Sequence, residues 1–389
     1  MNPDNWVAKL RRMNWLLVLA TAVVAGAGLA FVYSASFHSE EMRYMRQAKW
    51  LAAGAVIALL LALMHYRRLA REGWWLYGAG VILLLLVLAV GSEKYGGKRW
   101  IEFHGVSLQP SELAKLGTIV LLARLLSRPD ADLSRWRTTF ALLGLVVVPF
   151  LLVLVEPDLG SALVFPAVGF LMLAAAGVRR RILITLVALA ALGIASVAAL
   201  LLVPERMGWP KERQERALAR IGLKPYHQKR LEIFLDSSKD PTGAGYNKRQ
   251  ARIAIGSGGW SGKGYLNGAA NVLGFLPKKV APTDFIFCVV AEEMGFIRST
   301  VLLVLYGVIV VLIMMAAVAS ADKLGRLLCV GVAGLLFVHV FVNVGMTMGL
   351  LPIVGIPLPL MSCGGTYVVC TLAGLGLVQS VYVRRRAMR

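Results

Sequence analysis

The sequence predicts an all-α polytopic membrane protein, a single domain over residues 1–389 with about ten transmembrane helices. Of its 389 residues, 58% are hydrophobic and 16% are charged, and the mean hydropathy is +0.69. A soluble domain could not keep that much apolar surface away from water. Apolar runs that approach the roughly 20 residues needed for one membrane crossing lie at 15–34, 48–64, 74–91, 113–127, 138–155, 159–178, 182–203, 284–319, 327–351 and 358–383.

Basic residues indicate the direction in which these spans cross the membrane. They cluster at alternate span ends, namely Lys9/Arg11/Arg12, Arg67/Arg68/Arg71, Arg124/Arg128/Arg135/Arg137, Arg179/Arg180/Arg181, Lys323/Arg326 and Arg384/Arg385/Arg386/Arg389. Short loops rich in Lys and Arg stay in the cytoplasm. With ten spans, all these clusters fall on one face. Both termini are therefore predicted to be cytoplasmic, and residues 204–283 to form a large extracytoplasmic loop.

The formal net charge of +21 would suit a nucleic-acid-binding protein, but the distribution of the charge does not. Positive charge lies at span ends and in residues 204–283, where anionic headgroups or a phosphorylated substrate would meet it. We therefore predict no nucleic-acid partner. The cysteines lie in or beside apolar spans and lack metal-ligand spacing, which favours packing roles over metal sites or disulfides; they are Cys288, Cys329, Cys363 and Cys370.

The fourth span begins with charged residues. Pro110 suits the first turn of a helix, so Gln109-Pro110-Ser111-Glu112 predicts a helix start. Glu112 and Lys115 are three residues apart and can pair on one face. Charges inside a span normally face the bundle interior or an aqueous cavity. Two interpretations stay open: a structural ion pair that locks helices together, or a cavity wall at which Lys115 and Arg99 contact a pyrophosphate.

An acidic turn, Glu156-Pro157-Asp158-Leu159-Gly160-Ser161, joins the fifth and sixth spans on the predicted outer side. Proline and glycine account for a tight turn without any function. Its two carboxylates lie at the same predicted surface as Asp284, so they would also suit a divalent-cation site. Mg²⁺ or Mn²⁺ therefore stays open as a cofactor, and no metal ligand is assigned.

The outer segment 204–283 combines a basic helix with glycine-rich turns. Lys211 to Ile221 predicts a partly amphipathic helix that lies on the membrane surface. Glycines at 243–245 and 256–264 allow close backbone approach, which suits a loop over an extended substrate and equally a plain connector. Asp284 follows this segment, at the mouth of the eighth span. A carboxylate there would meet a lipid-linked, phosphate-bearing substrate as an acid or a base.

Polar residues also interrupt the last three spans. Glu292 and Glu293 lie about two turns inside Asp284, and at least one should face the bundle interior because lipid exposure of both would be costly. His339 and Asn343 share a helix face, which predicts a polar contact between helices. The prolines and glycines of 351–365 should break the backbone between spans nine and ten.

Seven motifs occur in order through nearly the whole chain: Lys98-Arg99-Trp100-Ile101, Gln109-Pro110-Ser111-Glu112-Leu113-Ala114-Lys115, Glu156-Pro157-Asp158-Leu159-Gly160, Ile253-Ala254-Ile255-Gly256-Ser257-Gly258-Gly259, Leu276-Pro277 with Thr283-Asp284-Phe285-Ile286-Phe287, Ala291-Glu292-Glu293-Met294-Gly295, and Asn343-Val344-Gly345-Met346 through Gly365. Together they resemble the SEDS proteins (shape, elongation, division and sporulation) of bacterial cell-wall synthesis. The short N-terminus and Gly355-Ile356-Pro357-Leu358-Pro359 resemble the elongation branch of that family. Cys363 and Thr366 depart from the usual Ser-Tyr-Gly-Gly-Ser pattern.

The resemblance implies a peptidoglycan glycosyltransferase in the bacterial cytoplasmic membrane. Such an enzyme polymerises lipid II on the extracytoplasmic side, during cell elongation, onto an undecaprenyl-pyrophosphate-linked glycan. A class B penicillin-binding protein and other elongation-complex proteins are the implied partners. The family's essential aspartate corresponds to Asp284, which we expect to be the general base of an inverting transfer. Substrate contacts are expected at Arg99, Glu112, Lys115, Lys278, Lys279, Gln250 and Ser257.

Other functions also fit the sequence. A polar cavity with an intramembrane ion pair would serve a lipid II flippase as well as a polymerase. A non-catalytic scaffold for the penicillin-binding protein is the third interpretation. For Asp284 itself, an aspartate before an apolar run would also suit a helix N-cap.

Overall fold

The computed structural model describes residues 6–37, 42–94, 97–103, 106–206, 225–277 and 280–385. Within these residues, nine helices are long and apolar enough to cross a membrane: α2 (Trp15–Ser36), α3 (Arg43–Leu63), α5 (Gly73–Val90), α7 (Trp136–Val155), α8 (Leu159–Ala176), α9 (Arg180–Arg206), α14 (Ile286–Val318), α15 (Lys323–Thr347) and α16 (Gly365–Val383). The shorter α6 (Pro110–Leu126) begins at Pro110, as predicted. These helices correspond to the ten predicted spans, and the predicted all-α polytopic fold is confirmed.

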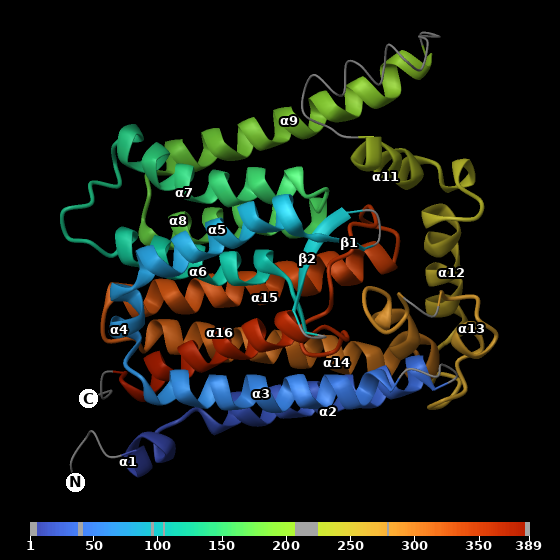
Figure 1. The fold of residues 1–389 in the computed structure, drawn as a ribbon, viewed down its shortest axis with the longest axis horizontal. Helices are drawn as coiled ribbons and strands as arrows, with labels where there is room; N and C mark the ends of the chain where they lie inside the picture. The colour runs from blue at the N-terminus through green and yellow to red at the C-terminus, as the bar shows by residue number, and fades with distance from the viewer. Residues whose placement is uncertain are drawn as a thin grey trace.

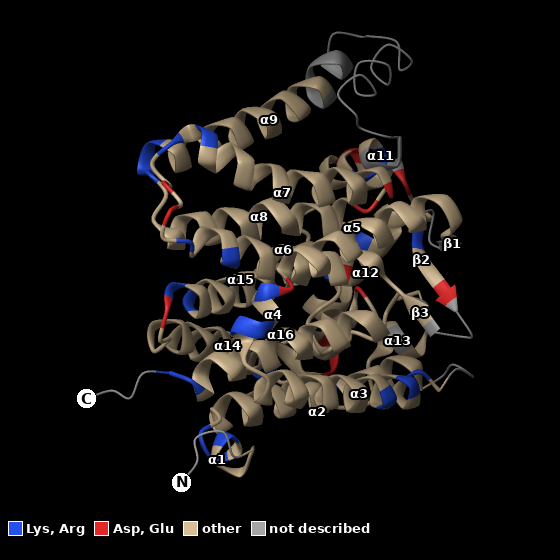
Figure 2. Ribbon diagram, turned by 60° about the vertical axis from the view of Figure 1, so that its left-hand side comes forward, with Lys and Arg blue, Asp and Glu red and all other residues tan. Residues whose placement is uncertain are grey.

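The helices run side by side, and the two ends of the bundle differ (Figure 1). One end carries both chain termini together with α1 (Trp6–Arg11) and α4 (Tyr66–Arg71). Basic residues gather at this end (Figure 2). Arg67 of α4 forms an ion pair of 2.8 Å with Asp322 at the start of α15. Arg384 donates to the Leu63 carbonyl oxygen at 2.6 Å. The described basic clusters thus share one face, as the sequence predicts.

The opposite end of the bundle carries the strands and the short helices. An antiparallel sheet in the order β1-β2-β3 consists of β1 (Ser92–Lys94), β2 (Gly97–Phe103) and β3 (Val106–Leu108). No strand was predicted here. Beside it lie α11 (Pro225–Leu235), the 3-10 helix η1 (Ser237–Lys239), α12 (Ala244–Ser257) and α13 (Ala269–Val272). The helix predicted at Lys211 to Ile221 lies outside the described residues.

The eighth predicted span is not one continuous helix. Gly295 in α14 has φ 73° and ψ −175°, which breaks the helix. Residues 258–264, here called the clamp segment, pair with the backbone groups that the break leaves free. The pairs are Lys263 N to Glu292 O at 3.0 Å, Gly264 N to Glu293 O at 3.0 Å, Phe296 N to Gly259 O at 2.8 Å and Ile297 N to Trp260 O at 3.2 Å. The clamp segment therefore supplies hydrogen-bond partners for the backbone groups that lose their helical partners at the break.

The tenth predicted span also starts later than expected. Residues 351–364, here called the proline loop, are not helical, and α16 begins only at Gly365. The loop contains three prolines, which cannot donate backbone hydrogen bonds, and Gly355 with a φ of 76°. It is largely buried, between α14, α15 and α16. The predicted backbone break between spans nine and ten is confirmed.

Candidate functional site

Asp284 lies just before α14, at the end of the bundle opposite the chain termini, with its side chain partly exposed. The N-cap residue of α14 is Phe285, and no side chain caps the helix, so Asp284 does not act as its N-cap. The Asp284 carbonyl oxygen accepts a hydrogen bond of 2.9 Å from Asn343 Nδ2. Its carboxylate Oδ2 lies 3.3 Å from the position that a Cβ atom would take at Gly355. A larger residue at 355 would therefore crowd the carboxylate.

The surroundings of Asp284 set its basicity. Burial raises the pKa of Asp284 to about 6; the nearby charge of Asp158 adds to the increase, while Arg230 and Arg99 oppose it. The group is then ionised at neutral pH and is a stronger base than an ordinary aspartate. This combination suits a carboxylate that removes a proton from a hydroxyl group.

The proline loop forms the wall beside Asp284, and side chains from neighbouring helices satisfy its carbonyl oxygens. Asn343 donates to Ile356 at 2.7 Å, Arg230 to Ile353 at 2.7 Å, Tyr367 to Pro357 at 3.0 Å, and Tyr306 to Pro359. Buried carbonyl groups outside a helix need such donors. A contact of Asn343 with another helix was predicted, but its partners are the two non-helical backbone segments that meet at Asp284.

Arg99 holds the acidic turn that follows α7. Its guanidinium donates to the Glu156 carbonyl oxygen at 3.4 Å and to the Pro157 carbonyl oxygen, and lies 3.9 Å from Asp158 Oδ1. Glu156 is 1% exposed, and its Oε1 has no hydrogen-bond partner among the described residues. Burial, followed by the charge of Asp158, raises the pKa of Glu156 to about 9 although Arg99 lowers it. Arg99 was predicted to bind a pyrophosphate, and here it orders the turn near Asp284.

The predicted ion pair of α6 is present and buried. Lys115 Nζ lies 2.7 Å from Glu112 Oε1, and both side chains are almost inaccessible to solvent. Lys115 Nζ also lies 3.2 Å from His339 Nε2 of α15. His339 Nδ1 in turn lies 2.9 Å from the hydroxyl oxygen of Tyr367 in α16. The pair therefore connects three helices, as the interpretation of a structural lock requires.

Glu292 and Glu293 are both buried; Glu292 anchors the segment that precedes α14, and Glu293 is bonded to α2. Glu292 Oε1 accepts hydrogen bonds from Lys263 Nζ at 2.6 Å and from Ser257 Oγ at 3.3 Å. Glu293 Oε1 accepts one of 2.5 Å from Ser34 Oγ in α2. The structure thus places Ser257 in a polar cluster about two turns along α14 from Asp284. Its predicted contact with the substrate stays a prediction.

Of the other predicted contact residues, the structure describes only Gln250. Gln250 is half-buried in α12. Lys278 and Lys279 lie outside the described residues. The four cysteines are free thiols, and Cys288, Cys329 and Cys370 are buried, which agrees with the predicted packing roles.

The acidic turn does not by itself form a metal site. Asp158 Oδ1 accepts a hydrogen bond of 3.1 Å from Ser161 N, and Oδ2 accepts one of 3.4 Å from Gln109 Nε2. Each of its oxygens thus has one hydrogen-bond donor. Over the part of the chain that the structure describes, no three His, Cys, Asp or Glu side chains are grouped to hold a metal ion. No chemical step is assigned to a divalent cation.

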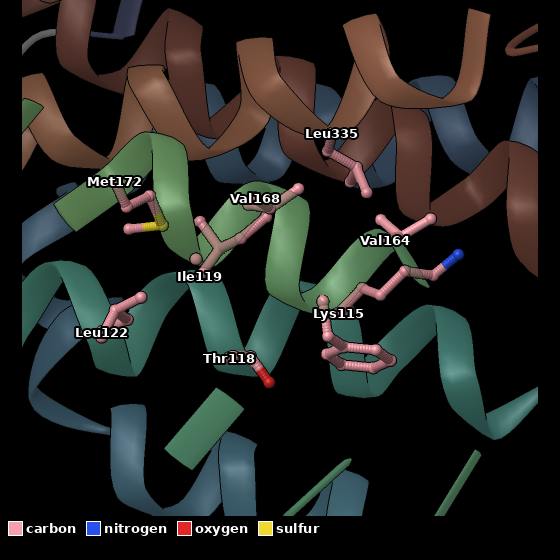
Figure 3. Close-up of a pocket in the computed structure, with 10 residues that line it drawn as sticks. Lys115, Thr118, Ile119, Leu122, Val164, Val168, Met172 and Leu335 are labelled. Atoms are coloured by element: carbon pink, nitrogen blue, oxygen red, sulfur yellow. The ribbon is translucent and has the colours of Figure 1, made fainter. Parts of the chain in front are cut away.

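A separate apolar pocket flanks the stem of Lys115 (Figure 3). It lies between α6, α8 and α15. Its apolar lining comes from Ile119 and Leu122 of α6, Val164, Phe165, Val168 and Met172 of α8, and Leu335 of α15. Asp284 is not among the lining residues, so the pocket is separate from the Asp284 site.

Sequence reasoning missed Arg230, the described basic residue with the largest electrostatic effect on Asp284. It lies in a long segment rich in Lys and Arg, where nothing distinguishes one basic residue from another. The linking roles of Tyr306 and Tyr367 were missed as well, because tyrosines in apolar runs usually serve packing. Only the folded structure brings them to the carbonyl oxygens of the proline loop.

Residues 11–387 match the family model described as cell cycle protein, which covers FtsW, RodA and SpoVE. The peptidoglycan glycosyltransferase MrdB of Escherichia coli strain K12 is 36% identical over 375 residues, which are 96% of this chain and 94% of that protein. A chain from work on the structural coordination of polymerization and crosslinking by a peptidoglycan synthase complex is 35% identical, with a TM-score of 0.76 and coverage of 96% and 98%. The rod shape determining protein RodA of Thermus thermophilus is 31% identical, with a TM-score of 0.68 and coverage of 96% and 98%.

Proposed function

The chain belongs to the SEDS family of FtsW, RodA and SpoVE, within which it is RodA-like, and on that premise we propose that it is the peptidoglycan glycosyltransferase that polymerises lipid II during cell elongation. The observation that carries the proposal is Asp284. It is a partly exposed carboxylate with a pKa raised to about 6, at the end of the bundle opposite the basic face. A base at that position would act on a substrate at the outer membrane surface.

Asp284 takes the proton in the proposed reaction. The acceptor is the 4-hydroxyl of a lipid II GlcNAc, and the donor is C1 of the MurNAc at the end of a pyrophosphate-linked strand. As the acceptor oxygen bonds to C1, the bond from C1 to the pyrophosphate oxygen breaks and its electron pair leaves with undecaprenyl pyrophosphate. Attack from the face opposite the leaving group converts an α-linked donor into a β-linked product. One base suffices, because the pyrophosphate departs without protonation by a protein acid.

Charge around Asp284 supports this assignment of roles. Arg230 and Arg99 favour the ionised form of Asp284, which is the form that accepts a proton. Both would also attract the negative charge that develops on the leaving pyrophosphate. Arg99 is committed to the acidic turn, so its effect on the substrate would be through its charge and through the position of that turn. Lys115 is committed to Glu112 and His339, deeper in the bundle.

The proposed setting is the bacterial cytoplasmic membrane, with both termini in the cytoplasm and Asp284 on the extracytoplasmic side. The similar chain of the peptidoglycan synthase complex supports a crosslinking partner, which we propose to be a class B penicillin-binding protein. Undecaprenyl tails of donor and acceptor would lie in the lipid around the apolar helices.

The test is polymerisation of lipid II by the purified protein, with and without its partner, for wild type and Asp284→Asn. Because Asp284 caps no helix, the variant should keep its fold and bind the partner. Loss of the base should lower the rate by about a hundred- to ten-thousand-fold. Polymerisation by Asp284→Asn near the wild-type rate would remove Asp284 from catalysis. Translocation of lipid II without polymer would favour the flippase, and neither activity would favour the scaffold.

A further inference from the structure

A chain of hydrogen bonds connects the buried ion pair of α6 to the proline loop. It runs from Glu112 through Lys115, His339 and Tyr367 to the carbonyl oxygen of Pro357. The successive distances are 2.7, 3.2, 2.9 and 3.0 Å. All four side chains are buried, so each polar atom depends on its neighbour in the chain.

The chemistry of the two ends fixes the direction of every bond. A charged lysine can only donate, so His339 Nε2 must accept from Lys115 and carry no hydrogen. A proline carbonyl can only accept, so the Tyr367 hydroxyl donates its one hydrogen to Pro357. Nδ1 of His339 therefore carries the hydrogen, which faces the Tyr367 hydroxyl oxygen and the Pro357 carbonyl oxygen. The imidazole is then neutral, and a single tautomer satisfies both neighbours.

The end of this chain lies in the wall of the candidate site. Pro357 follows Ile356, whose carbonyl oxygen shares the Asn343 side chain with the Asp284 carbonyl oxygen. Gly355, two residues before Pro357, lies directly against the Asp284 carboxylate. Because Pro357 and Pro359 supply no N–H groups, side chains must hold this stretch in place. The His339 and Tyr367 rings also stack, with centroids 5.1 Å apart, which fixes their mutual orientation.

We infer that His339 and Tyr367 are positioning residues for the polymerase, which transmit the position of the Glu112–Lys115 pair to the proline loop beside Asp284. The inference rests on the proposed function. It also gives the ion pair a role other than contact with a pyrophosphate. A small displacement of a reacting group can lower the rate by about a hundredfold. The position of the proline loop should therefore affect kcat.

The first test reads the tautomer directly. Full-length protein labelled with ¹⁵N at its five histidines is studied by NMR, and the His339→Asn variant identifies the signal of this ring. We expect a hydrogen on Nδ1 and none on Nε2. A hydrogen on Nε2, or on both nitrogens at neutral pH, would overturn the directed chain whatever the activity of the protein.

The second test uses two matched tyrosine variants. Tyr367→Phe and Tyr306→Phe each remove one hydroxyl that donates to a proline carbonyl oxygen of the same loop, at Pro357 and Pro359. Only Tyr367→Phe interrupts the chain. We expect it to lower kcat for lipid II polymerisation by about tenfold with an unchanged KM. Tyr306→Phe should lower Tm about as much as Tyr367→Phe does, because both remove one buried hydroxyl. Its effect on kcat should be smaller, and the NMR signal of His339 should be unchanged.

The outcomes separate this inference from the proposed function. Wild-type protein that polymerises, with Tyr367→Phe at the wild-type kcat, would refute the positioning role and leave the polymerase assignment intact. If Tyr367→Phe lowered kcat no more than Tyr306→Phe does, the positioning role would be refuted as well. Wild-type protein without polymerase activity would remove the proposed function, and this inference with it.

Discussion

At the scale of the residue, two carboxyl groups at the end of the bundle opposite the chain termini differ in what they can do. The pKa of Asp284 is raised to about 6 and that of Glu156 to about 9, in both cases first by burial. At neutral pH Asp284 is therefore ionised, while Glu156 keeps its proton. Different environments assign different roles to acids of similar intrinsic strength. Of the two, only Asp284 can serve as a base.

The pKa of Asp284 leads to a prediction about pH. Polymerisation should rise with pH through about 6 and then level off, because only the ionised carboxylate accepts a proton. Arg230→Gln removes a positive charge that favours the carboxylate but keeps a hydrogen-bond donor. The pKa of Asp284 should then increase, and the acid limb should move to higher pH.

Initial rates of polymerisation would be measured between pH 5 and 8, at roughly every half pH unit. They would define the acid limb of the pH–rate profile below and above the pKa of Asp284. Arg249→Gln, in α12, is the matched control, since its charge is not among those that act on Asp284. A limb that moved to lower pH in Arg230→Gln would contradict the assignment of Asp284 as the titrating base.

The buried ion pair gives a second prediction at this scale. Glu112→Gln or Lys115→Met alone should destabilise the protein by about 3–5 kcal/mol, because each leaves an unpaired buried charge. The double variant should regain most of that stability. Thermal unfolding of the four proteins would measure the coupling, and polymerisation would show whether the neutral pair still functions. Two single variants as stable as wild type would mean that the groups are not coupled.

The sequence was enough to predict the pair but not its connections. Spacing of three residues on a helix places Glu112 and Lys115 on one face whatever the tertiary structure. The contact with His339 depends on how α15 packs against α6, and no local pattern encodes that. Arg230 illustrates the same limit, because its effect on Asp284 arises only when α11 folds back over the proline loop.

At the scale of the element, α14 departs most from its prediction. Its hydropathy is continuous from 286 to 318, so the sequence predicts one long helix. Gly295 and Gly307 are two glycines in that run, and the sequence alone does not distinguish them. The difference is tertiary. The clamp segment approaches Gly295 so closely that a Cβ there would lie 2.2 Å from the Gly262 nitrogen, whereas one at Gly307 would meet nothing within 4 Å.

This difference predicts opposite results for two alanine substitutions in α14. Gly295→Ala should destabilise the protein by at least about 1–3 kcal/mol, since only glycine readily adopts its backbone angles and the clamp segment leaves no space. Gly307→Ala should be neutral or stabilising by up to about 1 kcal/mol, because alanine favours a helix. Midpoints of thermal unfolding in the same detergent would compare them. Equal midpoints would contradict the close packing at the break.

At the scale of the whole molecule, hydropathy and basic clusters predicted most of the architecture. Both reflect the bilayer, which imposes span length and loop charge on each segment separately. The short β-sheet near Arg99 was not predicted, because its strands of three to seven residues are too short for a reliable alternating pattern. Asp284, Arg99 and Asp158 come from distant parts of the chain. The predicted topology placed Asp158 and Asp284 at one membrane surface, but it could not show that Arg99 lies beside them.

The topology can be tested on the complete chain. Single cysteines at positions 249 and 180, introduced into a variant without native cysteines, should react with membrane-impermeant reagents from opposite sides. Position 249 lies in α12, at the predicted outer end, and position 180 begins α9 at the basic end. We expect labelling of intact cells at 249 alone, and labelling at 180 only after permeabilisation. The reverse pattern would invert the orientation and place Asp284 in the cytoplasm.

The break at Gly295 also bears on hydrophobic mismatch. The part of α14 after the break, residues 296–318, is roughly 35 Å long at 1.5 Å per residue, close to the thickness of a bilayer's hydrocarbon core. An unbroken helix over 286–318 would be roughly 50 Å long and would tilt to fit. The clamp segment is bonded to residues on both sides of the break, so it fixes the angle between the two parts of α14. The break therefore reduces the length mismatch that a continuous helix over 286–318 would impose on a bilayer.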